Sequence, residues 1–181
     1  MKITPLAIPD VVLIEPDVFS DARGDFFESY NAARLRAALG RDPAFVQDNQ
    51  SRSVRHVVRG LHYQIRQPQA KLVRVVAGEV FDVAVDLRRA SPTFGQWAGA
   101  LLSAENKRQL WVPEGFAHGF MVLSEVAETL YKATDYYAPA HERCVRWDDP
   151  DIGIAWPQQG EVIVSEKDRR GVALRDADTY A

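Results

Sequence analysis

Two of the four histidines in this 181-residue chain lie where a folded protein would ordinarily place an apolar side chain. His62 follows Gly60 and Leu61, and His118 lies in a run of Phe, Ala and Gly. A buried imidazole needs a polar partner, so both positions require an explanation. Because an imidazole with a pKa near ~6.5 exchanges its proton at neutral pH, the chemistry indicated is general acid–base catalysis.

Two further reactive groups interrupt apolar, strand-like segments. Lys71 opens the run Lys-Leu-Val-Arg-Val-Val, and Tyr131 lies within Thr-Leu-Tyr-Lys-Ala-Thr. A base, a cation and a phenol on neighbouring strands would share one cavity. Each also has a structural alternative: a core histidine bonded to backbone, a lysine at an exposed strand end, or a core tyrosine with a satisfied hydroxyl.

Composition limits the classes of protein that the chain can represent. Hydrophobic residues make up 46% and charged residues 26%, as in ordinary globular proteins. The formal net charge of −3 argues against nucleic-acid binding. Cys144 is the only cysteine, which excludes a disulfide framework and a cysteine-rich metal site. No segment is long or apolar enough for a membrane span or a signal sequence. We therefore expect one domain over residues 1–181 and a cytoplasmic location.

Short segments rich in Val, Phe, Tyr and Ile recur between Gly, Pro, Asn and Asp turn signals, which predicts a mainly β protein. Many strands with few helices favour a β-sandwich or jelly-roll barrel, whose mouth commonly holds a ligand. The predicted strands are Val11–Glu15, Asp25–Tyr30, Phe45–Ser53, Val57–Gln64, Lys71–Ala77, Val80–Asp86, Gln96–Leu102, Lys107–Val112, Gly119–Leu123, Glu128–Ala133 and Arg143–Arg146.

One helix has both of its boundary signals. Asn31 is a good N-cap, residues 32–39 form the body, and Gly40 is a typical C-terminal stop. Gly78 predicts a tight hairpin turn. The tail from about residue 157 is polar and predicted to be irregular, with a helical turn at residues 165–169.

Several motifs together resemble the dTDP-4-dehydrorhamnose 3,5-epimerase family, in order and with matching spacing from about Phe19 to Asp168. They are residues 47–51 (QDNQS), 59–64 (RGLHYQ), 71–73 (KLV), 83–88 (VAVDLR), 91–95 (SPTFG), 113–120 (PEGFAHGF), 131–132 (YK), 147–157 and 165–168 (SEKD). The resemblance implies a cupin-like jelly roll that is usually a homodimer and works without a metal or nicotinamide cofactor.

The activity implied is inversion at C3 and C5 of dTDP-4-dehydro-6-deoxy-D-glucose, a step towards dTDP-L-rhamnose. Such a reaction needs a base, an acid on the opposite face and a positive group near the enolate oxygen. The resemblance assigns these roles to His62 as base, Asp168 as its carboxylate partner, Tyr131 as acid and Lys71 as the cation.

The resemblance also implies a set of substrate-binding residues. Arginine suits the diphosphate because its planar fork matches phosphate oxygens, and Tyr137 would stack on the thymine ring. The other implied binding residues are Arg23, Glu28, Gln47, Asp48, Asn49, Arg59, His118, Glu142 and Lys167. Taken singly, each could equally be a solvated surface residue.

Two geometric questions arise around His62. Strict strand alternation would put Arg59 and His62 on opposite faces. If both serve one cavity, Gly60 marks a bulge or kink; otherwise Arg59 reaches a different part of the site. The stretch between His62 and Lys71 is also one residue shorter than is typical of the family, which affects the loop rather than any functional residue.

Three alternatives remain open at the level of sequence. A metal-dependent cupin usually carries a His-x-His ligand pair, but Tyr63 and Gln64 follow His62 here, and two isolated histidines make a poor site. A non-catalytic sugar-nucleotide-binding module would need the arginines without the acid–base groups. An epimerase acting at C3 or C5 alone would share the same motifs.

A homodimer is expected on a further ground, since apolar residues of the N-terminal strands (Val11, Val12, Ile14 and Phe26) exceed what one barrel needs. Exchange of edge strands would cover open sheet edges.

Overall fold

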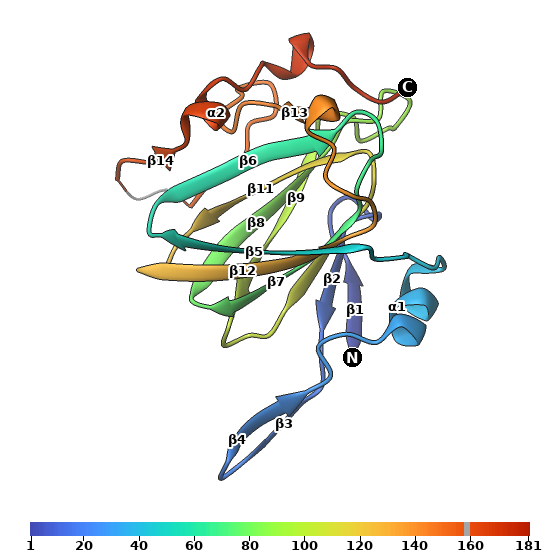
Figure 1. The fold of residues 1–181 in the computed structure, drawn as a ribbon, viewed down its shortest axis with the longest axis vertical. Coiled ribbons are helices and arrows are strands. Elements are labelled where there is room, and N and C mark those ends of the chain that lie inside the picture. The colour runs from blue at the N-terminus through green and yellow to red at the C-terminus, as the bar shows by residue number, and fades with distance from the viewer. Residues whose placement is uncertain (158–159) are drawn as a thin grey trace.

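The computed structural model describes residues 1–157 and 160–181 as two β-sheets packed face to face, with a separate hairpin (Figure 1). Sheet I has the strand order β1 (Lys2–Pro5), β2 (Val12–Glu15), β10 (Gln109–Val112), β7 (Lys71–Ala77), β12 (Val126–Ala133), β5 (Gln47–Val54). Sheet II has the order β13 (Glu142–Cys144), β6 (Val57–Gln64), β11 (Phe116–Val122), β8 (Glu79–Asp86), β9 (Trp97–Ser103), and β14 (Ile163–Val164) pairs in parallel with β6. The all-β, jelly-roll expectation is confirmed.

The remaining elements are short. The hairpin consists of β3 (Val18–Asp21) and β4 (Gly24–Phe27), which pair only with each other among the described strands. The helices are α1 (Ala32–Leu39), η1 (Pro139–His141), α2 (Glu166–Arg169) and η2 (Leu174–Asp176). None of these described helices is long and apolar enough to cross a membrane.

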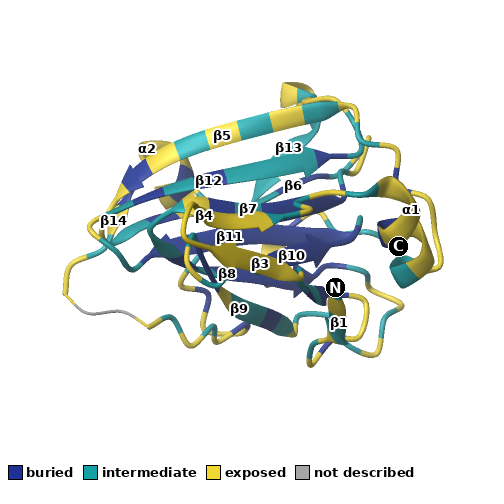
Figure 2. Cartoon of the chain, turned by 90° about the horizontal axis from the view of Figure 1, so that it is seen from below, coloured by how far each residue is buried: buried dark blue, intermediate teal, exposed yellow. Residues whose placement is uncertain are grey.

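The main core fills the space between the inner faces of the two sheets. Val73 and Val75 on β7 meet Val80 and Ala84 on β8, and Phe120 on β11 completes the layer. Each of these side chains is buried, and burial of apolar surface contributes roughly 25 cal/mol per Å². Figure 2 shows the resulting band of buried strands between exposed outer segments.

The outer face of sheet II is buried as well, because the C-terminal stretch folds over it. Val83 and Val85, which alternate with the inward residues of β8, pack against Ile152, Leu174 and Ala177. Burial on both faces explains why β8 reads as an almost continuous apolar segment rather than as an alternating one.

The C-terminal stretch was expected to be irregular. It contains β14, α2 and η2 and closes a second core. Two tyrosines fasten it to β6. The Tyr63 hydroxyl donates to the carbonyl of Asp178, and the Tyr180 hydroxyl donates to the carbonyl of Gln64. The helical turn predicted at residues 165–169 is confirmed as α2.

Other local predictions can be checked in detail. Asn31 caps α1 by accepting from the Arg34 amide, and Gly40 ends the helix with a φ of 65°. Gly78, with a φ of 71°, joins β7 to β8. The strand predicted at residues 25–30 was wrong at its end, since β4 stops at Phe27. Strands β1 and β3 were missed because they are short and largely exposed, which leaves no apolar alternation to detect.

A buried carboxylate organises the loop after β8. Asp86 accepts hydrogen bonds from Arg88, Ser91 and Thr93, and the Arg88 guanidinium lies 4.7 Å from the centre of the Phe116 ring. Burial alone would raise the pKa of Asp86, but these donors outweigh it and lower the pKa to about 2. The loop is thereby fixed to the start of β11.

The buried role of the C-terminal stretch can be tested with Leu174→Ala. Leu174 is 8% exposed within the second core, so its truncation is expected to lower the free energy of unfolding by about 2–4 kcal/mol. The control is Arg175→Ala, whose side chain is 76% exposed and should change stability by less than about 0.5 kcal/mol. Urea unfolding at one protein concentration measures both, and equal effects would show that this stretch is not part of the core.

Candidate active site

The candidate site is built around two neighbouring strands of sheet II, β6 and β11. His62 and His118 are directly paired across these strands. From this pair the register continues to Arg59 opposite Phe120, a step of three residues on β6 against two on β11. The extra residue forms a β-bulge at Gly60, which is one of the two possibilities that the sequence left open. Beyond it, the Arg59 Nε donates to Ser53 Oγ on β5 of the facing sheet, at 2.9 Å.

His62 is paired with the carboxylate expected from the family resemblance. Its Nε2 lies 2.6 Å from Asp168 Oδ1. Asp168 is 3% exposed and is held by α2, whose N-cap Ser165 accepts from the Asp168 amide. Burial raises the pKa of Asp168, but the hydrogen bond and positive charge of His62 outweigh this and leave that pKa below its ordinary value. Asp168 is therefore an anion that orients the His62 ring and can stabilise positive charge that develops on it.

Lys71 and Tyr131 project from sheet I. Lys71 is 8% exposed, and its Nζ lies 5.6 Å from the centre of the Tyr131 ring. Desolvation lowers the pKa of Lys71 to about 8, against the opposing effect of Asp82 and Glu142. Desolvation also raises the pKa of Tyr131. The phenol therefore keeps its proton at neutral pH, while the lysine remains largely a cation.

His118 forms a second imidazole–carboxylate pair. Its Nε2 lies 2.9 and 3.0 Å from the two oxygens of Asp82, and its ring centre lies 6.5 Å from that of Tyr131. Burial lowers the pKa of His118 despite Asp82. Sequence reasoning missed Asp82. A signal was present, because Asp82 occupies a core-facing position between Val80 and Ala84 where an unpaired carboxylate would be strongly destabilising.

A polar group lies beside this cluster, at the ends of β5 and β6. The Tyr137 hydroxyl donates to Glu142 Oε2 at 2.7 Å, and Lys167 Nζ donates to Glu142 Oε1. Gln47 accepts from the Tyr137 amide and donates to Asn49, which is paired with Tyr131 across β5 and β12. The structure thus brings five of the expected binding residues together.

Gln64 is a residue that the sequence interpretation did not single out. It is buried, and its side-chain amide accepts from the Ala138 amide and donates to the carbonyls of Gln67 and Tyr136. It therefore positions the loop that carries Tyr137. A long polar side chain at the end of an apolar strand was the available signal.

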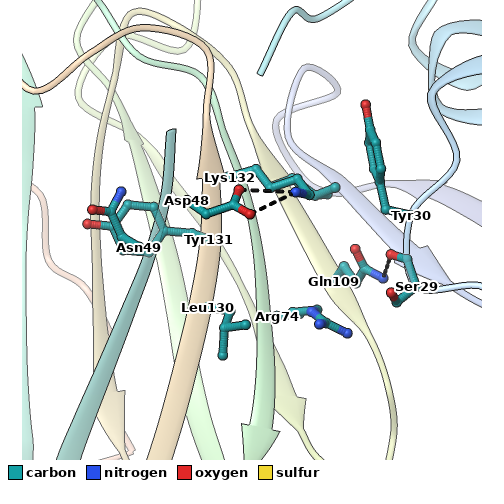
Figure 3. Close-up of a pocket in the computed structure, with 10 residues that line it drawn as sticks. Ser29, Tyr30, Asp48, Asn49, Arg74, Gln109, Leu130, Tyr131 and Lys132 are labelled. Atoms are coloured by element: carbon teal, nitrogen blue, oxygen red, sulfur yellow. Dashed lines mark hydrogen bonds and ion pairs between the residues drawn. The ribbon is translucent and has the colours of Figure 1, made fainter. Parts of the chain in front are cut away.

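Three expected binding residues lie apart from the cluster. Asp48 points to the outer face of sheet I, where it pairs with Lys132 at 3.0 Å in the pocket shown in Figure 3. Arg23 lies in the turn of the β3–β4 hairpin and pairs with Asp21, and this hairpin extends away from β6 and α2 (Figure 1). Glu28 follows the hairpin and bonds Asn31 at the start of α1.

One group among the described residues has ligand atoms close enough for a metal ion. The ligand atoms of His62, Cys144 and Asp168 lie within 4.8 Å of one another. Burial and the charge of Asp168 raise the pKa of the Cys144 thiol to about 12, which disfavours the thiolate that a metal prefers. The short His62–Asp168 hydrogen bond engages the other two ligands, so the set fits a proton better than a metal.

A β-sandwich with an imidazole–carboxylate pair, a buried ammonium and a buried phenol defines an enzyme of acid–base chemistry. Comparison with known proteins then gives the family. The profile described as dTDP-4-dehydrorhamnose 3,5-epimerase matches residues 5–176. The chain belongs to this family, and it is an isomerase.

Individual relatives agree over nearly their whole lengths. The dTDP-4-dehydrorhamnose 3,5-epimerase of Pseudomonas aeruginosa is 66% identical over 180 residues, with 99% of each chain covered. The crystal structure of a Legionella pneumophila 3,5-epimerase in complex with dTDP-4-keto-L-rhamnose has a TM-score of 0.95 at 52% identity, covering 98% of this chain and 94% of that one. A 3′-monoepimerase from Streptomyces bikiniensis with dTDP-quinovose has a TM-score of 0.89 at 37% identity, covering 94% and 87%.

Proposed function

We propose that this enzyme inverts C3 and C5 of dTDP-4-dehydro-6-deoxy-D-glucose by proton transfer through an enolate, in dTDP-L-rhamnose biosynthesis. The observation that carries the mechanism is the opposed placement of two groups. His62 with Asp168 comes from sheet II and its covering helix, whereas Tyr131 comes from sheet I. Inversion requires removal of a proton from one face of a carbon and delivery to the other.

His62 is the base in this proposal. It takes the proton from the carbon next to the C4 ketone, and the electrons of that C–H bond form the enolate double bond. The carbonyl electrons move onto the C4 oxygen. Asp168 stabilises the imidazolium that results, since its carboxylate lies 2.6 Å away.

Lys71 stabilises the negative oxygen. Its ammonium lies within the sandwich, where the low dielectric strengthens its attraction to the developing charge. Tyr131 then gives its phenolic proton to the opposite face of the carbon. Solvent removes the proton from His62 and restores that of Tyr131 before the second carbon reacts.

The nucleotide is held by the remaining groups. Arg59 supplies donors for the diphosphate, and the cluster of Gln47, Asn49, Glu142 and Lys167 with Tyr137 receives the rest of the nucleotide. The ring of Tyr137 is half exposed, as stacking on thymine requires. The single free thiol, Cys144, is compatible with a reducing compartment, and we place the enzyme in the cytoplasm.

We further propose that the working enzyme, a single domain over residues 1–181, is a homodimer. Of the apolar residues expected to support a dimer, Val11, Val12 and Ile14 do not, because they are buried within their own chain. Phe26 does support it, together with Phe19, since they are 74% and 67% exposed on the β3–β4 hairpin.

The hairpin also carries Arg23, which one copy alone holds away from its own site. Among the described strands, β5 is the edge of sheet I beside the site, and an open edge accepts a further strand. Exchange of hairpins between two copies would cover both features and deliver Arg23, followed by Glu28, to the partner's nucleotide site.

The base assignment predicts the behaviour of His62→Asn. The variant should bind dTDP nearly as tightly as the wild type, because other residues hold the nucleotide. Its epimerisation rate should fall by at least about 10²–10⁴-fold. Calorimetry with dTDP and NMR of the 4-keto sugar measure the two quantities, and a rate within a few-fold of wild type would refute the assignment.

Tyr131→Phe tests the two-face mechanism. Phenylalanine retains the ring and its packing, so the fold should survive, while His62 and Lys71 can still form the enolate. In deuterated water we expect deuterium to enter with retained configuration, and inversion to fall steeply. Counting deuterons at C3 and C5 by NMR also separates the 3,5-epimerase from a single-position enzyme. If exchange and inversion fall together, Tyr131 is not the opposite-face acid.

The dimer can be tested with Phe26→Asp. Light scattering of the wild type should give twice the 20.3 kDa of one chain, and the variant should dissociate and lose affinity for dTDP. Leu101→Asp is the control, because Leu101 is 43% exposed on β9, the edge strand of sheet II, and should change neither property. A wild-type mass of one chain at every concentration would contradict the proposal.

A further inference from the structure

Asp82 is a fully buried acid that the mechanism above does not use. It lies on the inner face of β8, between Val80 and Ala84, and has no exposed surface. An apolar residue at this position would fill the core without any desolvation penalty. Removing a carboxylate from water costs several kcal/mol unless partners compensate. Its partners therefore indicate what the charge does.

The first partner is His118. Both carboxylate oxygens lie within hydrogen-bond distance of its Nε2. Because an ionised carboxylate can only accept, this nitrogen must carry the proton. The bond fixes the ring orientation and the tautomer, and it leaves Nδ1 as the imidazole nitrogen that is free of Asp82.

Lys71 belongs to the same buried cluster, since its Nζ lies 5.6 Å from the centre of the Tyr131 ring, which lies 6.5 Å from that of His118. The charge of Asp82 acts on the Lys71 ammonium through space. The charged and titratable groups that face it come from several elements: Asp82 on β8, Glu142 on β13, Tyr131 on β12 and His118 on β11. Burial favours the neutral amine, and the two carboxylates oppose that effect, Asp82 more strongly than Glu142. His118 adds no favourable charge, since burial keeps it neutral.

We propose that Asp82 is a positioning residue for the epimerisation, which orients His118 in the site and keeps Lys71 a cation. This inference rests on the proposed role of Lys71 in stabilising the enolate. Asp82 exchanges no proton with the substrate. It supplies a fixed negative charge behind the site, so that Lys71 can present a positive charge to the C4 oxygen although it is almost fully buried.

The test compares the pH dependence of kcat/KM in the wild type and in Asp82→Asn, which keeps the shape and an acceptor but removes the charge. The wild-type activity should decline as the pH rises through about 8, where Lys71 loses its proton. In the variant this decline should begin about one to three pH units lower, with kcat/KM reduced at least about threefold at pH 7.5. Affinity for dTDP should change less than threefold.

Asp86→Asn is the matched control, because Asp86 is equally buried on the same strand but bonds Arg88 instead. It should lower the melting temperature without moving the decline in activity. A decline that stays at the wild-type pH in Asp82→Asn would overturn the inference. So would a loss of dTDP affinity in step with stability, which would mark Asp82 as merely structural.

Two further measurements test the role of Asp82 and separate it from the proposed epimerase mechanism. Nitrogen-15 NMR of the wild type should show His118 protonated at Nε2 from pH 6 to 9, and protonation at Nδ1 would overturn the inference even if Asp82→Asn does not fold. If His62→Asn is inactive while Asp82→Asn keeps the wild-type pH profile, the epimerase mechanism stands and the role of Asp82 fails. If His62→Asn stays active, the mechanism itself fails.

Discussion

The geometry of the site depends on the close contact between β6 and β11 at two glycines. A Cβ on Gly119 would lie 2.5 Å from the carbonyl oxygen of Arg59, and one on Gly60 would lie 2.6 Å from that of His118. Non-bonded atoms do not approach so closely, so neither position can accept a side chain without moving a strand. The bulge formed here places His62 opposite His118 and still lets Arg59 reach β5 in the facing sheet. His62, the proposed base, and Arg59, the proposed diphosphate-binding residue, can thereby act in the same site.

The charged groups of the site are arranged in pairs, because a buried charge without a partner would be strongly destabilising. The two histidines of the site each have a buried carboxylate, His62 with Asp168 and His118 with Asp82. The two pairs differ in exposure, since His62 retains 28% of its side-chain surface and His118 only 6%. The accessible pair can exchange protons with substrate and solvent, while the enclosed pair is suited to holding a fixed charge distribution.

The sequence predicted the sandwich, α1 and the Gly78 turn, because each depends on local chemistry that a short segment displays. It left the bulge at Gly60 as one of two possibilities. It indicated His62, His118, Lys71 and Tyr131 because reactive groups in apolar strands are conspicuous. Asp168 came only from the family resemblance, since its burial is created by a distant packing contact. Asp48 was also implied by the family resemblance. It lies between Gln47 and Asn49 in the sequence, but strand alternation turns its side chain to the other face of sheet I.

The placement of Asp168 links catalysis to the second core. Helix α2 has only four residues, too few to be stable alone. It is preceded by β14, which pairs with β6. It is followed by Val172, which bridges to Val145, and then by η2 and Tyr180, whose hydroxyl bonds the end of β6. Leu174 and Ala177 bury this segment against the outer face of sheet II. Apolar contacts on one side of the sheet therefore fix the carboxylate that orients His62, and the packing of the C-terminal stretch is a condition for His62 to act as the proposed base.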